Sequence, residues 1–287
     1  MPPMEGAGRD EQGPLNWVGL DVDRTRPNPA RMYDYYLGGA HNFGVDRALA
    51  EQALSVMPWM REAVRANRAF LRRAVRHCLD QGVRQFLDLG AGIPTVGAVH
   101  EVAHAVDAAA EVVYIDNEPV AVSHAELLLA HVAHARVVNA DLTDPDQVLG
   151  HPMVRAALDW SQPVAVLALA VLHFVADPAA AAAVLNRYRT AMGPSGWLVF
   201  SHVTADHDPD EARWATAVYQ RSASPVYARS HHELQEMLAG YELLEPGLVD
   251  ATEWRPGSPA PRAGEHAGFY AAVAHPAPLG PVEETRR

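Results

Sequence analysis

The segment at 88–95 has the residue types that a ligand-binding loop needs. It reads DLGAGIPT and follows a short apolar run. The glycines of Gly90-Ala91-Gly92 allow a tight turn and a close approach of the backbone to a ligand. A dinucleotide-binding loop would carry a third glycine where this chain has Thr95, so that motif is incomplete. Asp88 is an acceptor of hydrogen bonds and predicts a cationic or donor-bearing ligand rather than a pyrophosphate.

Carboxylates also end the next two apolar runs of the chain, at Asp116 and Asp141. Because the carboxyl ends of parallel strands meet at one edge of a sheet, we expect Asp88, Asp116 and Asp141 around a common crevice. Asp116, with Asn117 beside it, is suited to accept from both hydroxyls of a ribose. Asp141 is suited to accept from an adenine amino group, with Leu142 against the ring. The alternative is that each aspartate only caps the next helix.

His173 follows the fourth apolar run, and His202 ends the fifth. His173 comes shortly after Ala170, which ends the fourth run and is expected to touch the ligand. An imidazole titrates near neutral pH, so His173 is our candidate for the base that takes a proton from a substrate. Packing is the alternative for His173, and a stronger alternative for His202.

Short apolar runs alternate with helix-length segments through the middle of the chain. The runs are 85–89, 111–115, 136–140, 164–170 and 197–202, and the helical segments lie near 95–108, 118–131, 151–158 and 178–191. Two helices and two strands follow, at 209–221, 230–238, 241–249 and 268–274. Strands that are apolar at nearly every position and separated by helices predict a parallel, doubly wound α/β sheet covered on both faces. A loop without a helix joins the last two strands, which are therefore expected to be antiparallel neighbours.

Three helices are expected before the sheet, at 28–37, 45–57 and 58–81. The first begins with Asn28 as N-cap and Pro29 at the first helical position. We interpret 25–82 as a helical cap on a domain over 83–275, because a segment of that size with few large apolar residues makes a weak core alone. Flexible tails are expected at both ends, over 1–24 and 276–287.

The composition excludes several classes of function. All 23 basic residues are arginine, so the chain has no lysine for Schiff-base, pyridoxal-phosphate or Walker-A chemistry. The formal net charge of −12 argues against nucleic acid as a partner. Cys78 is the only cysteine, no apolar stretch is long enough to span a membrane, and the first residues do not resemble a signal peptide. These features predict a cytoplasmic protein.

One motif resembles a metal site. His100 and His104 lie in the sequence HEVAH, which matches the zinc-protease pattern H-E-x-x-H. The predicted helix starts at the glycine loop, however, and no third ligand follows in a suitable context. No metal is therefore expected.

Several longer stretches are distinctive when taken together. They read MYDYYLGG at 32–39, FLDLGAGIPT at 86–95, VVYIDNEPV at 112–120, VVNADLTDP at 137–145 and AVLHFVADP at 170–178. Over about residues 25–275 the chain resembles the actinobacterial S-adenosylmethionine methyltransferase family once catalogued only as a domain of unknown function. It departs modestly from the family's pattern, with GAGIPT where relatives commonly have GTGLPT.

The resemblance implies a class I methyltransferase fold, with seven strands in the order 3-2-1-4-5-7-6, and S-adenosylmethionine as the methyl donor. It implies no particular substrate and no oligomeric state. With nucleic acid disfavoured, we expect a small-molecule methyl acceptor and no membrane partner. One alternative is a regulatory or degenerate protein that binds the cofactor without transferring the methyl group. A nicotinamide oxidoreductase is a further alternative, disfavoured by Thr95.

The segment around MYDYYLGG is the expected lid over the cofactor. Tyr33 and Tyr36 are three residues apart and share one helix face, so their rings could pack over the sulfonium. Asn42 follows a pair of glycines and is expected to bind the methionine part of the cofactor. The alternative is a helix face packed on the sheet. Arg68 either pairs with the cofactor carboxylate or lies on an exposed helix face.

Overall fold

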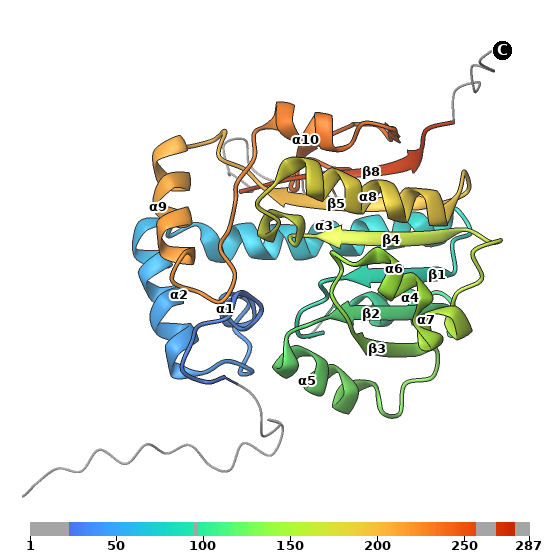
Figure 1. The fold of residues 1–287 in the computed structure, drawn as a ribbon, viewed down its shortest axis with the longest axis horizontal. Coiled ribbons are helices and arrows are strands. Elements are labelled where there is room, and N and C mark those ends of the chain that lie inside the picture. Colours follow the sequence, from blue (N-terminus) through green and yellow to red (C-terminus); the bar gives the residue numbers. More distant parts are fainter. Residues whose placement is uncertain (1–22, 95–96, 257–267, 279–287) are drawn as a thin grey trace, which may run out of the picture.

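The computed structural model describes residues 23–94, 97–256 and 268–278, which are organised around one sheet (Figure 1). Its parallel strands are β1 Gln85–Leu89, β2 Glu111–Asp116, β3 Ala135–Asn139, β4 Val164–Leu169 and β5 Trp197–Val203. The strands β6 Tyr241–Leu243, β7 Val249–Asp250 and β8 Phe269–Pro276 pair antiparallel. The order is β3-β2-β1-β4-β5-β8-β6, and β7 pairs with β8 off this path.

The strand order confirms the expected fold with one correction at its C-terminal edge. We expected a single strand over 241–249, but β6 ends at Leu243 and β7 forms separately. Pro246 has no N–H to offer a strand ladder, and Gly247, at φ 92°, turns the chain back by donating its N–H to the Leu244 oxygen at 2.8 Å. β8 therefore takes the place of the predicted seventh strand, and its antiparallel pairing with β6 is confirmed.

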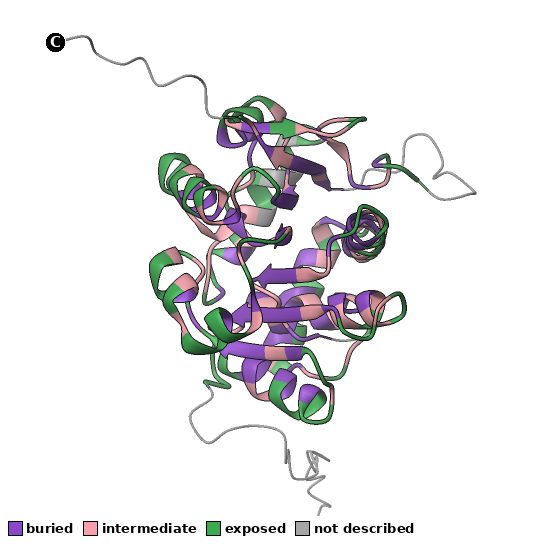
Figure 2. Cartoon of the chain, turned by 90° about the vertical axis from the view of Figure 1, so that its right-hand side faces the viewer, coloured by how far each residue is buried: buried purple, intermediate pink, exposed green. Residues whose placement is uncertain are grey.

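Helices cover both faces of the sheet (Figures 1 and 2). One face carries α3 Met60–Asp80, α4 Val99–His104 and α5 Pro119–Leu129. The other carries α6 Pro145–Gly150, α7 Pro152–Ala157, α8 Pro178–Met192 and α10 His231–Met237. Phe86 and Leu87 are neighbours in β1 but belong to the two different core clusters, as the alternation of side chains along a strand requires.

One helix prediction needs correction, and one helix of this region was not expected. The helix expected over 95–108 is the shorter α4, and residues 95–96 lie outside the described residues. The helix expected over 151–158 is α7, and a second short helix that was not expected, α6, directly precedes it. Each begins with a proline, Pro145 after the N-cap Asp144 and Pro152 after the N-cap His151. Proline lacks an N–H and fits the first turn of a helix, so it starts a new helix instead of continuing the old one.

The helical cap is formed by α1 Pro29–Tyr36, α2 Gly44–Val56, the start of α3, and α9 Pro209–Tyr219. Asn28 caps α1 as predicted, because its side-chain oxygen accepts the Ala30 N–H at 2.8 Å. Tyr219 and Val226, from late in the chain, belong to the same apolar cluster as α1 and α2. The division into a cap over 25–82 and a domain over 83–275 remains a proposal. This apolar cluster includes residues from both sides of that boundary.

The predicted tails fall largely on residues 1–22 and 279–287, which lie outside the described residues. β8 extends to Pro276, one residue into the second of these predicted segments. Within the described ranges, no helix has the length and apolar character needed to cross a membrane.

Candidate functional site

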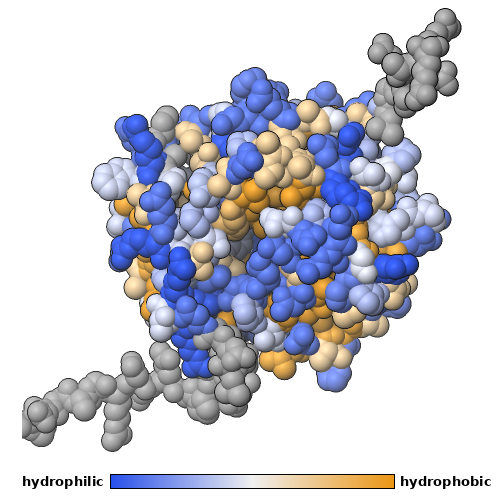
Figure 3. Space-filling view, viewed as in Figure 1, coloured by the Kyte–Doolittle hydropathy of each residue, from blue (hydrophilic) through white to orange (hydrophobic). Residues whose placement is uncertain are grey.

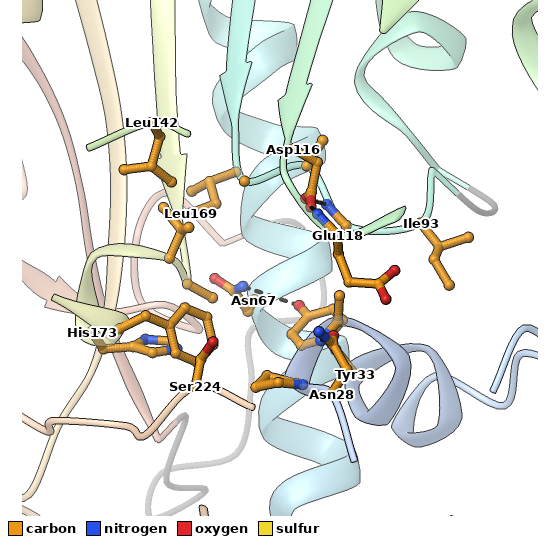
Figure 4. A pocket seen from close by; sticks show the side chains of 18 of the residues that line it. Asn28, Tyr33, Asn67, Ile93, Asp116, Glu118, Leu142, Leu169, His173 and Ser224 are labelled. Atoms are coloured by element: carbon orange, nitrogen blue, oxygen red, sulfur yellow. Dashed lines mark hydrogen bonds between the residues drawn. The ribbon is translucent and has the colours of Figure 1, made fainter. Parts of the chain in front are cut away.

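A cavity of about 350 Å³ lies where the carboxyl ends of β1 to β4 face α1 and α3 (Figure 4). Figure 3 shows a hollow on this face of the molecule. The volume falls within the range of small-molecule sites. Open α/β sheets bind their ligands at this edge, because the loops that leave the strands meet there.

The glycine loop forms one wall of the cavity, with Gly90, Ala91 and Gly92 all lining it. Gly90 and Gly92 have φ values of 63° and 61°, which side-chain-bearing residues rarely adopt. A Cβ on Gly90 would lie 2.1 Å from Val171 Cγ2, so a larger residue would clash with the turn that follows β4. The tight turn expected at Gly90-Ala91-Gly92 is confirmed. Thr95 lies outside the described residues.

Asp116 holds the glycine loop in place. Its Oδ2 accepts the Gly92 N–H at 2.7 Å and its Oδ1 accepts the Glu118 N–H at 2.8 Å. The helix-cap alternative does not hold for Asp116, because Glu118 caps α5 by accepting the Ala121 N–H at 2.8 Å. Burial raises the pKa of Asp116, and the hydrogen bonds from Glu118 and Gly92 oppose that rise. Asn117 also lines the cavity.

Asp88 is buried at the end of β1, with 6% of its surface exposed. Burial raises its pKa to about 7; the nearby Arg68 lowers it and Asp116 raises it further. Arg68 also lines the cavity, and its Nε is buried without a hydrogen-bond partner. Arg68 therefore does not lie on an exposed helix face, which was the alternative to a role at the cofactor. A half-buried cation and a buried carboxyl beside each other can receive a zwitterionic group.

Asp141 and Leu142 line the cavity after β3. Asp141 is exposed, and its Oδ1 accepts from the Thr143 N–H at 2.8 Å and the Thr143 hydroxyl at 2.7 Å. It therefore stabilises its own turn, while the next helix is capped by Asp144.

Ala170 also lines the cavity and has a positive φ of 52°. Its N–H donates to the Ser201 oxygen at 3.0 Å, which holds this strained residue at the edge of the sheet.

The expected lid residues separate into three environments. Tyr33 lines the cavity, its ring lies 5.8 Å from the Arg68 guanidinium carbon, and its hydroxyl accepts from the Asn67 amide at 3.1 Å. Tyr36 lines the cavity further from the glycine loop, where the Tyr219 hydroxyl donates to its own at 3.2 Å. Asn42 requires a correction, because it is not among the lining residues. Its amide donates to Asp34 Oδ2 at 2.8 Å and it is 6% exposed.

His173 lines the cavity from the short 3-10 turn η1 Leu172–Phe174 and is 6% exposed. Its Nδ1 is buried without a hydrogen-bond partner. Burial lowers the pKa of His173 well below its usual value, and His202 and Arg229 add to this effect. The ring is therefore neutral near pH 7.

His202 does not line the cavity and serves a structural role behind His173, with ring centroids 5.5 Å apart. Its Nδ1 lies 2.7 Å from the Val203 oxygen and its Nε2 lies 2.8 Å from Arg229 Nη1. A guanidinium only donates, so Nε2 carries the lone pair and Nδ1 the proton. Burial lowers the pKa of His202 to about 3.

Sequence reasoning missed two groups of residues at the site. Arg31 donates from Nη1 to Glu118 Oε1 at 2.7 Å and from Nε to Asp46 Oδ2 at 2.9 Å, which joins the cap to α5. The Asn67 oxygen accepts the Ser201 hydroxyl at 2.7 Å. The only local signal was Glu118 before Pro119, an N-cap pattern. The partners of these residues are far away in the chain and leave no periodic signal.

Segment 222–229, between α9 and α10, was also missed and closes the cavity on one side with Ser224 and Val226. The Tyr227 N–H donates to the His173 oxygen at 2.8 Å. Arg229 donates to the Val175 oxygen at 2.6 Å and to the Leu172 oxygen at 3.2 Å. These bonds hold the segment against η1.

The H-E-x-x-H motif lies on α4, away from the cavity lining. His100 Nδ1 lies 2.7 Å from the Tyr114 hydroxyl, and His104 Nε2 lies 2.9 Å from the Ala110 oxygen. Both imidazoles have local partners. No group of three or more histidine, cysteine or carboxylate side chains suited to a metal ion occurs in the described part of the chain.

The sheet order, the glycine loop and the acids at the strand ends define a class I S-adenosylmethionine-dependent methyltransferase. The chain belongs to the S-adenosyl methyltransferase family, whose model matches residues 16–277. S-adenosylmethionine is the cofactor of that family.

Two solved structures are similar over most of their length. A candidate methyltransferase from Thermobifida fusca YX is 35% identical, with a TM-score of 0.83, covering 89% of this chain and 97% of its own. A DUF574 family protein from Streptomyces avermitilis MA-4680 is 34% identical, with a TM-score of 0.83, covering 88% of this chain and 99% of its own. A search of curated proteins finds no match to the chain.

Proposed function

We propose that this methyltransferase transfers the methyl group to a small molecule that binds inside the cavity, beside His173. The observation that carries the proposal is the size and lining of this cavity, which has about 350 Å³ and walls from α1, α3 and segment 222–229. A cavity of this size suits a small molecule. The net charge of −12 also disfavours a nucleic-acid acceptor.

The residues around the glycine loop fit the cofactor. Its carboxylate has a partner in Arg68, whose buried Nε lacks one, and its cationic groups have a partner in Asp88. We propose that Asp116 and Asn117 receive the ribose hydroxyls. The remaining cofactor contacts in this proposal are Gly90, Ala91, Gly92, Asp141, Leu142, Ala170 and Tyr33.

The protein's contribution to the reaction is to orient the acceptor, exclude water and receive a proton. When bound, S-adenosylmethionine supplies an electrophilic methyl group on a positively charged sulfur. α1 and segment 222–229 exclude water around the acceptor, and orientation alone supplies a large part of such a rate enhancement. We propose that His173 accepts the acceptor's proton, because its neutral ring borders the cavity and its Nδ1 has no other partner.

Cofactor affinity is expected to rise with pH up to about pH 7 and then to level off. The carboxyl of Asp88 has a pKa of about 7, and a cationic ligand favours its ionised form. Below that pH, binding must release a proton and weakens by up to about tenfold per pH unit. Calorimetric titration with S-adenosylhomocysteine, which keeps the ammonium group, measures affinity and proton release between about pH 5 and about pH 8.

The Asp88→Asn variant is the control for this pH dependence, because its amide does not titrate. It should bind without the proton release. Equal proton release by the wild type and the variant would show that the titrating group is not Asp88.

The small-molecule acceptor is tested by labelling. The protein is incubated with S-adenosylmethionine labelled in its methyl group and an extract of Streptomyces avermitilis, which is then ultrafiltered. We expect label in the ultrafiltrate. Label found only in the retained nucleic acid or protein would contradict the proposal.

In the same assay the His173→Ala variant should bind S-adenosylhomocysteine as the wild type does but label the acceptor about 10²- to 10⁴-fold more slowly. His202→Ala is the matched control, because it removes the neighbouring ring outside the cavity lining. Normal turnover by His173→Ala would assign His173 a packing role.

A further inference from the structure

The charged side chains that line the cavity belong to its glycine-loop end. They are Arg68, Asp88, Asp116, Glu118 and Asp141, together with Asp34 of α1. The carboxylate of Asp34 is engaged by the loop after α1, where Oδ2 accepts the His41 N–H at 2.8 Å. Glu118 is paired with Arg31 at 2.7 Å. All the charge that the described lining offers is therefore on the side where the cofactor is proposed to bind.

The opposite end, which we call the acceptor end, has apolar and aromatic walls. Its main side chains are Tyr36, Met60, Val64, Phe174, Tyr219 and Val226, from α1, α3, η1, α9 and segment 222–229. Figure 4 places His173 and Ser224 on this side, across the cavity from Asp116 and Glu118. No charged side chain lines this end among the residues that the structure describes.

Polar groups at the acceptor end are few and neutral. The hydroxyl of Tyr219 donates to that of Tyr36 at 3.2 Å. The ring of His173 stands edge to face with Phe174, with centroids 4.4 Å apart, and its Nδ1 lacks a partner. Ser224 adds a neutral hydroxyl on this side. His173 is therefore the residue of the described acceptor end whose side chain can act as a base.

These walls discriminate by charge. A carboxylate or ammonium group there would lose its hydration and find no counter-ion among the described lining residues, which opposes its binding. An uncharged ring would bury apolar surface and gain edge-to-face contacts with the aromatic side chains.

The proposed role of His173 as a base limits which chemical group of the acceptor can receive the methyl group. In methylation of a hydroxyl, the O–H bond breaks and an O–C bond to the methyl carbon forms. The bond from that carbon to sulfur breaks and leaves its electron pair on sulfur, so the sulfonium would become a neutral thioether. The released proton needs an acceptor, and the neutral imidazole supplies one. The apolar walls require an uncharged acceptor, and a role for His173 as a base requires an acceptor that releases a proton. An aromatic hydroxyl meets both requirements, since it is uncharged on entry and gives up a proton on methylation.

We infer that the acceptor end takes an uncharged aromatic alcohol, with its ring against the apolar wall and its hydroxyl toward His173. This inference rests on the proposed function and adds the chemical class of the acceptor.

The test compares three probes of one ring size and different charge: 1-naphthol, 1-naphthoate and 1-naphthylmethylammonium. Each is titrated calorimetrically into the full chain saturated with S-adenosylhomocysteine. We expect 1-naphthol to bind at least about tenfold more tightly than either charged probe. Equal binding of a charged probe, or no binding of 1-naphthol, would overturn the inference.

A variant then places the probe. Val226→Asp adds a carboxylate to the acceptor end and should weaken 1-naphthol binding by at least about tenfold, with S-adenosylhomocysteine affinity retained. Val226→Thr, which keeps the shape, should weaken it less and serves if the aspartate variant does not fold. Val106→Asp is the matched control, because Val106 is 40% exposed and does not line the cavity. Unchanged 1-naphthol affinity in both Val226 variants would refute this location.

The labelling experiment separates this inference from the proposed function. Label in the ultrafiltrate on a carboxylate or an amine would overturn the acceptor class and leave the small-molecule function intact. Label only in the retained material would overturn both.

Discussion

Replacing Arg31 by methionine is expected to lower the free energy of unfolding by about 3–5 kcal/mol, because it leaves two buried carboxylates without their cation. Arg31 is 2% exposed, and its partners Asp46 and Glu118 are 0% and 6% exposed. Methionine retains much of the side-chain volume, so the change reports mainly on charge and hydrogen bonds. Thermal unfolding followed by circular dichroism should show a loss in Tm on the order of 10 °C.

The matched control for Arg31 is Arg187→Met. Arg187 contacts Asp146 at 2.7 Å, but their side chains are 44% and 77% exposed, so this pair should contribute less than about 1 kcal/mol. The double variant Arg31→Met, Glu118→Gln should recover part of the loss, since one of the two stranded charges is gone. Equal Tm shifts in Arg31→Met and Arg187→Met would show that the buried group contributes no more than a surface pair.

The same arginine connects stability to cofactor binding. Glu118 donates its N–H to Asp116 and pairs with Arg31 of α1 through its side chain. Movement of α1 away from α5 would therefore disturb Glu118, whose N–H donates to Asp116, the residue proposed to bind the ribose hydroxyls.

Replacing Asp116 by alanine is expected to weaken S-adenosylhomocysteine binding by roughly 1–3 kcal/mol, or about 5- to 150-fold. Two effects combine. The variant loses the proposed hydrogen bonds to the ribose, and it releases the Gly92 and Glu118 N–H groups, which the carboxylate accepts at 2.7 and 2.8 Å. Isothermal titration calorimetry of the folded variant measures the loss directly.

Two further aspartates calibrate this result. Asp141 accepts from Thr143 in an exposed turn at the cavity, and Asp159 accepts from Ser161 in an equivalent turn that does not line it. Asp141→Ala should weaken binding by less than Asp116→Ala, and Asp159→Ala should leave it unchanged. If Asp116→Ala binds like Asp159→Ala, the ribose does not contact Asp116.

The sheet and the glycine loop follow from local sequence. The five parallel strands lie within a residue or two of the apolar runs, because full burial of a strand requires apolar side chains at nearly every position. Once the strands are parallel, residues directly after them must share one edge. Asp88, Asp116 and Asp141 were therefore predicted together at the cavity, although the carboxylate of Asp141 also stabilises its own turn.

The cap was predictable as helices but not as a surface. The pattern of 28–37 shows that Tyr33 and Tyr36 share a helix face, and it does not show what that face meets. The structure directs Tyr33 to Asn67 and Tyr36 to Tyr219, which is 183 residues later in the chain. It also turns Asn42 to Asp34 and away from the cavity.

The sequence by itself determined the fold class, the turn at Gly90-Ala91-Gly92 and the edge at which the acids gather, since each depends on residues adjacent in the chain. Only the tertiary structure decided the surroundings of His173, the pairing of Arg31 with Glu118, and the uncharged acceptor end. Those features join residues from distant segments, such as Arg31 and Glu118, 87 positions apart. The rotation of each helix about its axis is set by packing across the whole core, which a local pattern does not encode.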